Sequence, residues 1–316
     1  MSVTKTILSG RSLLRILPFV LLFQGARAQQ DPMYSMYMWN MLTIMPAYAG
    51  SADVLNATAL SRVQWSAING APTTHTLTGH APITRHNLGV GMSLVHDRIG
   101  RTYTTSAFGD IAYRIKLDRS TRLAFGLKMG INHASIQNTQ VENTDPNDPT
   151  FQSDRTGRVH PNFGFGVYLW SKRGYLGASV PKLLHNYLAA AETEGDMVRY
   201  FQEASHMFIT GGYVFPLGST KFKPAFMVRA TQGAPLSADL SANFLFMERF
   251  WVGAAYRNGD SYTGIFSLQL NDQFRMGYAY DIGTSKLTSR ANGAHEIMIS
   301  YDPVFTRERV RSPRYF

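Results

Sequence analysis

His96 and Asp97 are the first candidates for a catalytic pair, because an imidazole beside a carboxylate can transfer protons. Such a unit works only if both groups converge on a nucleophile or a water molecule within hydrogen-bond reach. Neighbouring residues of a β-strand point to opposite faces of the sheet. We therefore expect His96 and Asp97 to be hydrogen-bonded residues at a strand end rather than a catalytic site.

The other candidate motifs are weaker. Residues 218–221 (Gly-Ser-Thr-Lys) resemble the end of a phosphate loop but lack its upstream glycine spacing, so they predict a turn. Residues 145–149, with Glu142 and Asp154 nearby, offer oxygen ligands for a hard cation without the regular spacing of a calcium loop. A proline-stiffened acidic surface loop is the favoured interpretation, with calcium as the alternative. No G-x-S-x-G or H-E-x-x-H motif occurs. The sequence thus predicts no enzyme and no catalytic, cofactor or metal residues.

Composition indicates an exported membrane protein. There is no cysteine, and therefore no disulfide, thiolate nucleophile or sulfur metal site. Charged residues make up 16%, whereas soluble globular proteins have about 25%. After residue 28 no apolar stretch is long enough for a transmembrane helix. Since only helices and closed barrels satisfy their backbone hydrogen bonds in lipid, a β-barrel is the expected solution.

The first 28 residues have the features of a secretory signal peptide. Lys5, Arg11 and Arg15 precede a short apolar run at 16–23, and Ala26-Arg27-Ala28 supplies a cleavage site before Gln29. A retained anchor is the alternative. Removing 1–28, with its four basic and no acidic residues, lowers the formal net charge from +10 to +6. This imbalance, without basic blocks interleaved with aromatics, predicts no nucleic-acid partner.

Alternation with a period of two is the main structural signal. In residues 122–131 one face carries Leu123, Phe125, Leu127, Met129 and Ile131, and the other carries small or charged residues. A soluble sandwich or lipocalin-like barrel would also alternate. However, the polar face here is rich in glycine and in charges of both signs, as in the lumen of a membrane barrel, namely Arg114, Lys116, Lys128, Lys223, Arg229, Asp239, Arg275 and Asp281.

The pattern predicts an all-β fold, an antiparallel transmembrane barrel of about fourteen strands between residues 54 and 302. Every second connection is a tight turn, and the remaining connections include the two longest, 136–158 and 182–204. With the N-terminus in the periplasm, the tight set becomes periplasmic turns, and 136–158 and 182–204 become extracellular loops. The second loop could form a short amphipathic helix. The expected strands are 54–65, 74–83, 88–97, 103–117, 121–135, 159–171, 174–181, 205–215, 220–231, 236–247, 249–257, 261–270, 272–281 and 294–302.

The segments flanking the barrel differ in character. Residues 29–53 are too apolar for a free tail, which predicts that they fold into the lumen or against the periplasmic mouth and hide Tyr34, Tyr37, Trp39 and Tyr48. The tail 303–316 carries Arg307, Arg309, Arg311 and Arg314, and we expect it in the periplasm.

A set of short motifs covers essentially the whole mature chain. Near the start, Tyr37-Met38-Trp39-Asn40 is followed by Pro46-Ala47-Tyr48-Ala49-Gly50. Together the motifs resemble the PorP/SprF-like outer-membrane proteins of the type IX secretion system of Bacteroidetes, although Trp39 and Met45 stand where that family usually has Phe and Asn. Further matching stretches are 30–32, 62–65, 70–73, 89–94, 148–151, 161–166, 177–184, 268–273, 277–281 and 295–298.

The resemblance implies a function that the periodicity does not. Its members sit in the outer membrane of these Gram-negative bacteria and belong to the type IX secretion and gliding machinery. They associate with periplasmic ring and peptidoglycan-associated components, and they support secretion or surface anchoring of adhesin-like cargo through the cargo's C-terminal domain. The loops 136–158 and 182–204 are the expected region of cargo contact. A small-solute pore is the alternative, and a membrane-embedded hydrolase is a third.

Overall fold

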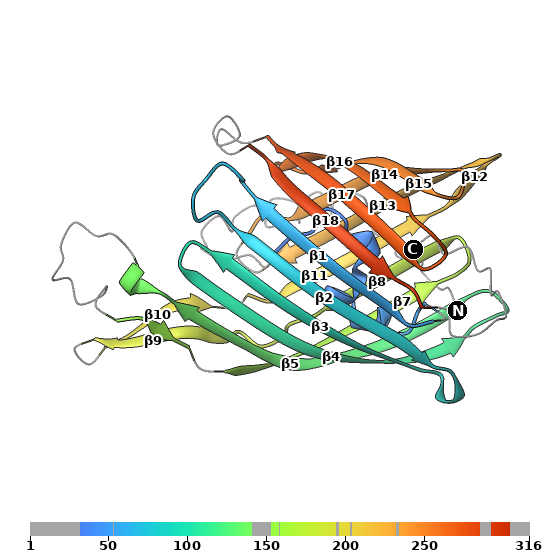
Figure 1. Cartoon of the computed structure of the whole chain (residues 1–316). Coiled ribbons are helices and arrows are strands. Elements are labelled where there is room, and N and C mark those ends of the chain that lie inside the picture. The colour runs from blue at the N-terminus through green and yellow to red at the C-terminus, as the bar shows by residue number, and fades with distance from the viewer. Residues whose placement is uncertain are drawn as a thin grey trace, which may run out of the picture.

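Fourteen long antiparallel strands close into a barrel in the computed structural model (Figure 1). The structure describes residues 32–52, 54–140, 153–157, 159–193, 196–202, 204–231, 234–284 and 292–303. Each long strand pairs with its neighbours in chain order, and the ring closes where β1 pairs with β18. The fourteen are β1 (Asn56–Gln64), β2 (Thr73–Ile83), β3 (Leu88–Ile99), β4 (Thr102–Lys116), β5 (Arg122–Ile136), β7 (His160–Trp170), β8 (Gly174–Val180), β11 (His206–Tyr213), β13 (Thr220–Thr231), β14 (Ser237–Phe246), β15 (Phe250–Arg257), β16 (Ser261–Gln269), β17 (Phe274–Gly283) and β18 (Ala294–Tyr301).

The strand prediction is confirmed, with every boundary within two residues of its expected place. Alternation predicts these strands well because successive side chains point to opposite faces, one toward lipid and one toward the lumen. Two short strands add to the sheet without entering the ring. β6 (Arg155–Thr156) pairs with β5, and β12 (Phe215–Leu217) pairs with β13.

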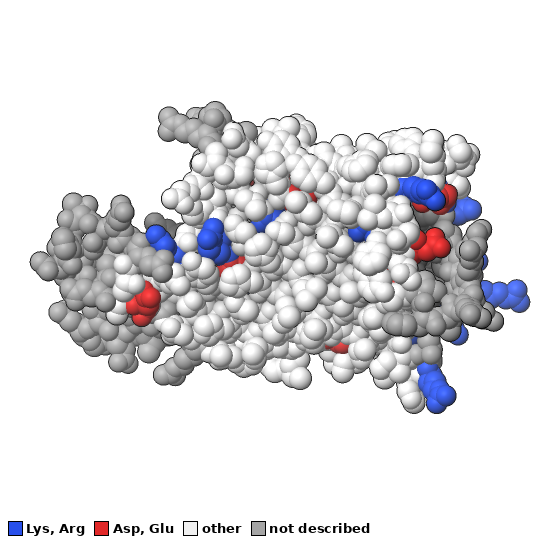
Figure 2. Space-filling view, viewed as in Figure 1, with Lys and Arg blue, Asp and Glu red and all other residues white. Residues whose placement is uncertain are grey.

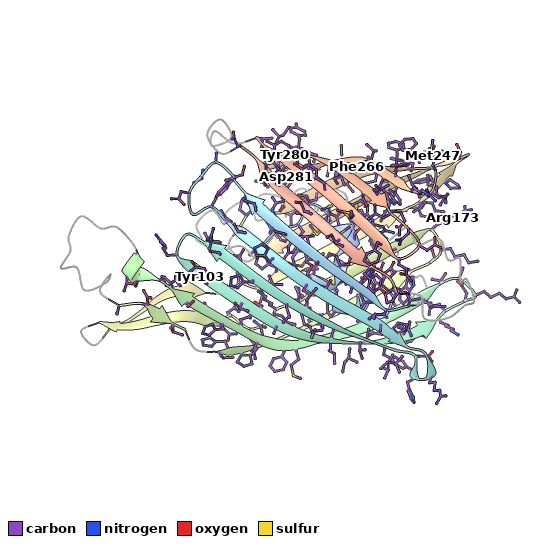
Figure 3. All side chains as sticks on the ribbon, in the orientation of Figure 1. Tyr103, Arg173, Met247, Phe266, Tyr280 and Asp281 are labelled. Carbon is purple, nitrogen blue, oxygen red and sulfur yellow. The ribbon has the colours of Figure 1, made fainter. Side chains whose placement is uncertain are left out.

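The outer surface of the barrel is apolar between its two ends. Leu127 and Met129 on β5 are 68% and 64% exposed, and Figure 3 shows Phe266 on β16 pointing outward. Charged residues gather near the two ends of the molecule in the view of Figure 2, with few between. An apolar band of this kind fits a bilayer core. Among the residues that the structure describes, no helix has the length and hydropathy needed to cross a membrane.

The two ends of the barrel differ. At one end all six connections between the long strands are short, including those around Arg173 and Met247 (Figure 3), and we call it the turn end. The strands β1 and β18 also meet there, since Ala57 pairs with Tyr301. The opposite end carries the long connections β5–β7 and β8–β11, and we call it the loop end. Tyr103, at the beginning of β4, lies at the loop end in Figure 3.

The helix expected within 182–204 is wrong. The chain forms a hairpin of β9 (Tyr187–Thr193) and β10 (Asp196–Gln202), which make a separate two-stranded sheet. The run of alanines favours a helix by local propensity. Antiparallel pairing instead joins the alanine-rich strand to a second strand that is rich in β-forming residues such as Val198 and Phe201.

Residues 32–52 lie inside the barrel, and we call them the lumenal segment. Three single-turn 3₁₀-helices follow one another in it: η2 (Tyr37–Trp39), η3 (Met41–Thr43) and η4 (Pro46–Tyr48). Its large side chains are buried and form the core cluster together with inward residues of the strands. The expected signal peptide 1–28, the acidic stretch 145–149 and nearly all of the tail 303–316 lie outside the described residues.

Candidate functional site

The lumenal segment crosses the barrel from the loop end to the turn end. Near the loop end, Ser35 contacts Glu296 at the beginning of β18 and Asp281 at the end of β17. Near the turn end, the backbone N–H of Gly50 donates a hydrogen bond to Nδ1 of His80, close to the end of β2. The segment is therefore held at both ends.

A buried cluster of one cation and two carboxylates holds the segment near the loop end. The Glu296 carboxylate accepts hydrogen bonds from the backbone N–H groups of Ser35 (2.9 Å) and Met36 (2.7 Å). Arg62 donates to Glu296 at 3.0 Å and to Asp281 at 2.6 Å. The Ser35 hydroxyl donates to Asp281 at 2.7 Å. We call this cluster the Arg62 latch. A fully paired buried ion cluster fixes the position of the groups that it joins. Loss of one partner leaves an unpaired buried charge and destabilises the fold.

The middle of the segment is held through its backbone carbonyls. The ammonium of Lys128 lies 3.2 Å from the carbonyl oxygen of Leu42 and 3.0 Å from a carboxylate oxygen of Asp110. The Ser179 hydroxyl donates to the carbonyl of Ile44 at 2.6 Å. Inward side chains of separate strands thus supply the hydrogen bonds that a non-sheet backbone needs when it is buried.

Close packing adds to these bonds. A side chain on Gly126 would place its Cβ 2.2 Å from the backbone nitrogen of Ala47, so only glycine lets η4 lie against β5. Similarly, the carbonyl of Gly50 accepts a hydrogen bond from Arg114 at 2.7 Å, and Gly50 lies against Gly89 of β3 with a φ of +68°. At Gly126 and Gly89, the backbone of the lumenal segment is therefore in direct contact with the backbone of the barrel strands.

Aromatic contacts fix the side of the segment that faces β13 and β15. Trp39 and Trp251 pack edge to face with centroids 6.1 Å apart. The ammonium of Lys223 lies 5.8 Å from the Trp39 ring and 5.7 Å from the Trp251 ring. A buried cation placed over indole faces is attracted by their quadrupoles.

The candidate chemistry of the sequence does not converge in the structure. His96 lies on the outer face, where its Nδ1 is 2.9 Å from the Thr105 hydroxyl. Asp97 instead accepts a hydrogen bond from Thr74, a buried inward residue. Gly218 and Ser219 form the turn between β12 and β13, whereas Thr220 and Lys221 begin β13. Lys221 forms an ion pair with Glu248. Within the described ranges no group of three or more metal-ligating side chains occurs.

Two carboxylates in the connections between strands accept hydrogen bonds from other residues of the same connection. Asp118 in the β4–β5 turn accepts hydrogen bonds from the backbone of Ser120 and Thr121, which lower its pKa to about 2. Asp154 accepts from the backbone and hydroxyl of Thr139, and these bonds lower its pKa too. Asp154 thus joins the beginning and the end of the connection between β5 and β7.

The sequence identified part of the inward charge and missed the rest. Of the eight charged residues expected on the lumenal face, six are buried, Arg275 is partly buried, and Lys116 is exposed at the turn end. The six are Arg114, Lys128, Lys223, Arg229, Asp239 and Asp281. Arg62, Asp110, Arg257 and Glu296 are also buried and were not singled out. Their position on the polar face of their strands was the available signal. Their partners were not visible in the sequence, because Arg62 and Glu296 are joined only by closure of the barrel.

Residues 26–301 match the family described as type IX secretion system membrane protein PorP/SprF. No relative among the curated proteins matches the chain. The toluene transporter TbuX of Ralstonia pickettii is 11% identical, with a TM-score of 0.49, over 90% of this chain and 97% of that chain. Omp33 of Acinetobacter baumannii is 8% identical, with a TM-score of 0.45, over 79% of this chain and 98% of that chain. No functional conclusion follows from similarities this distant.

Proposed function

Because the chain belongs to the PorP/SprF family of type IX secretion system membrane proteins, we propose that it supports the secretion or surface anchoring of a large adhesin-like protein. The barrel itself is an outer-membrane protein of this system. The proposal adds that the cargo is engaged through its C-terminal domain and that the barrel is a scaffold without catalysis.

The occupied lumen is the observation that supports a scaffold most directly. The lumenal segment contacts inward side chains from both ends of the barrel and is largely buried. Passage of a folded or unfolded protein through this interior would require the segment to leave. The outer surfaces at the two ends therefore remain for partners, and loops on a rigid scaffold are a common place for recognition.

The two ends suit different partners. With the usual orientation of bacterial barrels, the turn end faces the periplasm and the loop end faces outward. The loop end then presents the β9–β10 hairpin to cargo at the surface. The turn end carries basic residues in several connections, and we propose it as the contact for periplasmic ring and peptidoglycan-associated components. These residues are Arg85, Arg119, Lys172, Arg173 and Arg249.

A small-solute pore is the competing function, and the occupied lumen weighs against it. A barrel of this strand number is wide enough for a small channel only when nothing fills it. The lumenal segment occupies it, with contacts to Glu296 near the loop end, to Lys128 in between and to His80 near the turn end. A hydrolase is also disfavoured, because the side chains of His96 and Asp97 lie on opposite faces of the sheet and do not form a catalytic pair.

The test is complementation of a strain from which the gene has been deleted. Surface and medium proteins are compared by mass spectrometry after expression of the wild-type chain or of a chain in which residues 187–202 are replaced by a short Gly-Ser turn. We expect the deletion to lose a specific set of large surface proteins and the wild-type chain to restore them. The hairpin variant should insert normally and restore them poorly. An unchanged set of surface proteins after deletion would contradict the proposal.

A further inference from the structure

A group of polar side chains lies on the outer face of β2 to β5, just beyond the apolar band. His75 pairs directly with His96, His96 with Thr105, and Thr105 with His133. These four residues form one row across four strands. The next row toward the loop end contains Arg98 opposite Tyr103. We call the six residues His75, His96, Arg98, Tyr103, Thr105 and His133 the collar.

The collar begins where the apolar surface ends. One step toward the turn end, the corresponding outward row is Leu77, Leu94, Ala107 and Ile131. On β5 the outward apolar residues run from Leu123 to Ile131. They span about 20 Å along the membrane normal at a rise of about 3.3 Å per residue and a tilt of about 40°. The hydrophobic band of such barrels is about 25 Å tall, so the collar lies at the level of the lipid headgroups.

The collar consists of hydrogen-bond donors without an accompanying carboxylate. Arg98 carries a fixed positive charge, and His75, His96 and Arg98 are exposed. His96 and Tyr103 lie with ring centroids 6.2 Å apart. Among the described residues of β2 to β5, the acids are Asp97, which bonds to the buried Thr74, and Asp110, which pairs with the buried Lys128. Both face the lumen, so the outward face of these four described strands carries no carboxylate.

We propose that the collar binds the phosphate groups of phosphorylated lipids in the outer leaflet of the membrane. A guanidinium group matches phosphate geometry with two parallel hydrogen bonds, and hydroxyl and imidazole groups add further donors. Facing histidines such as His75 and His96 also suit a transition-metal ion. However, Arg98 beside them would repel a cation, and the outward face of these strands supplies no carboxylate ligand. The site fits an anion. This inference does not depend on the role in secretion.

The test measures retention of lipid A by the purified barrel in detergent, using native mass spectrometry. Bis-phosphorylated lipid A is compared with the same lipid after removal of its phosphates. We expect the wild-type chain to prefer the phosphorylated lipid. The triple variant H75Q/H96Q/R98Q should bind it about tenfold more weakly, since charge-assisted hydrogen bonds are lost. The control H86Q/K116Q/R122Q removes three basic residues near the turn end that lie outside the proposed periplasmic contact, and it should bind the lipid like the wild-type chain.

Equal affinity of the wild-type chain for both lipids would overturn the proposal, and so would equal losses in the two triple variants. Loss of binding on addition of EDTA would assign the collar to a bridging metal ion and would also overturn it. Folding of each variant is checked by its heat-dependent shift in gel mobility. If the collar variant fails to fold, the single variant Arg98→Gln, at an exposed position, gives the same comparison.

Discussion

Within the Arg62 latch, Glu296 is the side chain that binds two residues of the lumenal segment, Ser35 and Met36. It accepts hydrogen bonds from two backbone N–H groups of the segment and from Arg62, and it is fully buried. Its loss leaves a buried guanidinium with one carboxylate partner fewer and two backbone donors without an acceptor. Removing one partner from a buried ionic cluster is far more damaging than the net stabilisation by the cluster suggests.

We therefore expect Glu296→Ala to lower the free energy of unfolding by about 3–5 kcal/mol. The matched variant Glu296→Gln keeps an acceptor oxygen and the side-chain shape, so its loss should be clearly smaller. Denaturant unfolding from lipid vesicles measures both. Equal stabilities of the alanine variant and the wild-type chain would show that the latch does not hold the segment.

Asp118 gives a pH-dependent prediction outside the membrane. Its pKa in the folded chain is about 2, because the backbone N–H groups of Ser120 and Thr121 donate to the carboxylate. A carboxyl group with a lowered pKa stabilises the fold fully above its unfolded pKa of about 4, and this stabilisation is lost as the pH falls through the folded pKa. We expect a carboxyl NMR titration with a midpoint near pH 2. A midpoint near pH 4 would mean that the turn is not closed by Asp118.

At the scale of elements, the fit between η4 and β5 depends on the missing side chain of Gly126. A methyl group there would lie 2.2 Å from the backbone nitrogen of Ala47. Gly126→Ala should therefore shift or displace the lumenal segment, destabilise the barrel by about 1–3 kcal/mol and raise ion conductance in a planar bilayer. The control Gly264→Ala, on β16, adds a methyl group with no atom within 4 Å. It should leave stability and conductance unchanged. A non-conducting, fully stable Gly126→Ala barrel would contradict the packing.

The direction in which the lumenal segment crosses the barrel is also testable. Met33 lies beside the Arg62 latch near the loop end and is partly exposed, whereas Arg119 lies in a turn at the opposite end. The chain has no native cysteine, so single cysteines can be labelled cleanly. A membrane-impermeant maleimide should label Met33→Cys on intact cells and Arg119→Cys only after the outer membrane is permeabilised. The reverse result would show that the barrel has the opposite orientation.

Elements differ in how far their sequence predicts them. The strands follow from alternation alone, because lipid on one side and a polar lumen on the other impose opposite residue types at successive positions. The β9–β10 hairpin does not follow, because its alanines favour a helix locally and its strand pairing depends on a partner in space. The apolar character of residues 32–52 predicts that their side chains are buried away from water. Their hydrogen-bond partners lie far away in sequence, as Ser35 and Glu296 do, and only the closed barrel brings them together.

At the scale of the whole molecule, the barrel combines an occupied interior, two ends whose connections differ in length and an apolar outer band. The occupied interior explains why inward charges are abundant in a chain with few charged residues overall. Arg62, Lys128 and Arg257 each lie within ion-pair distance of an inward carboxylate. We therefore propose that partners contact the loops and the turns rather than the lumen.

The most direct test of this account is capture of the tagged barrel from its own outer membrane in a mild detergent, followed by mass spectrometry. The scaffold proposal predicts recovery of a large surface protein bound through its C-terminal domain, together with periplasmic components of the secretion system. Replacement of residues 187–202 should release the surface protein and keep the periplasmic ones. Recovery of the barrel alone, together with steady ion conductance of the wild-type chain in a planar bilayer, would contradict the account and favour a pore.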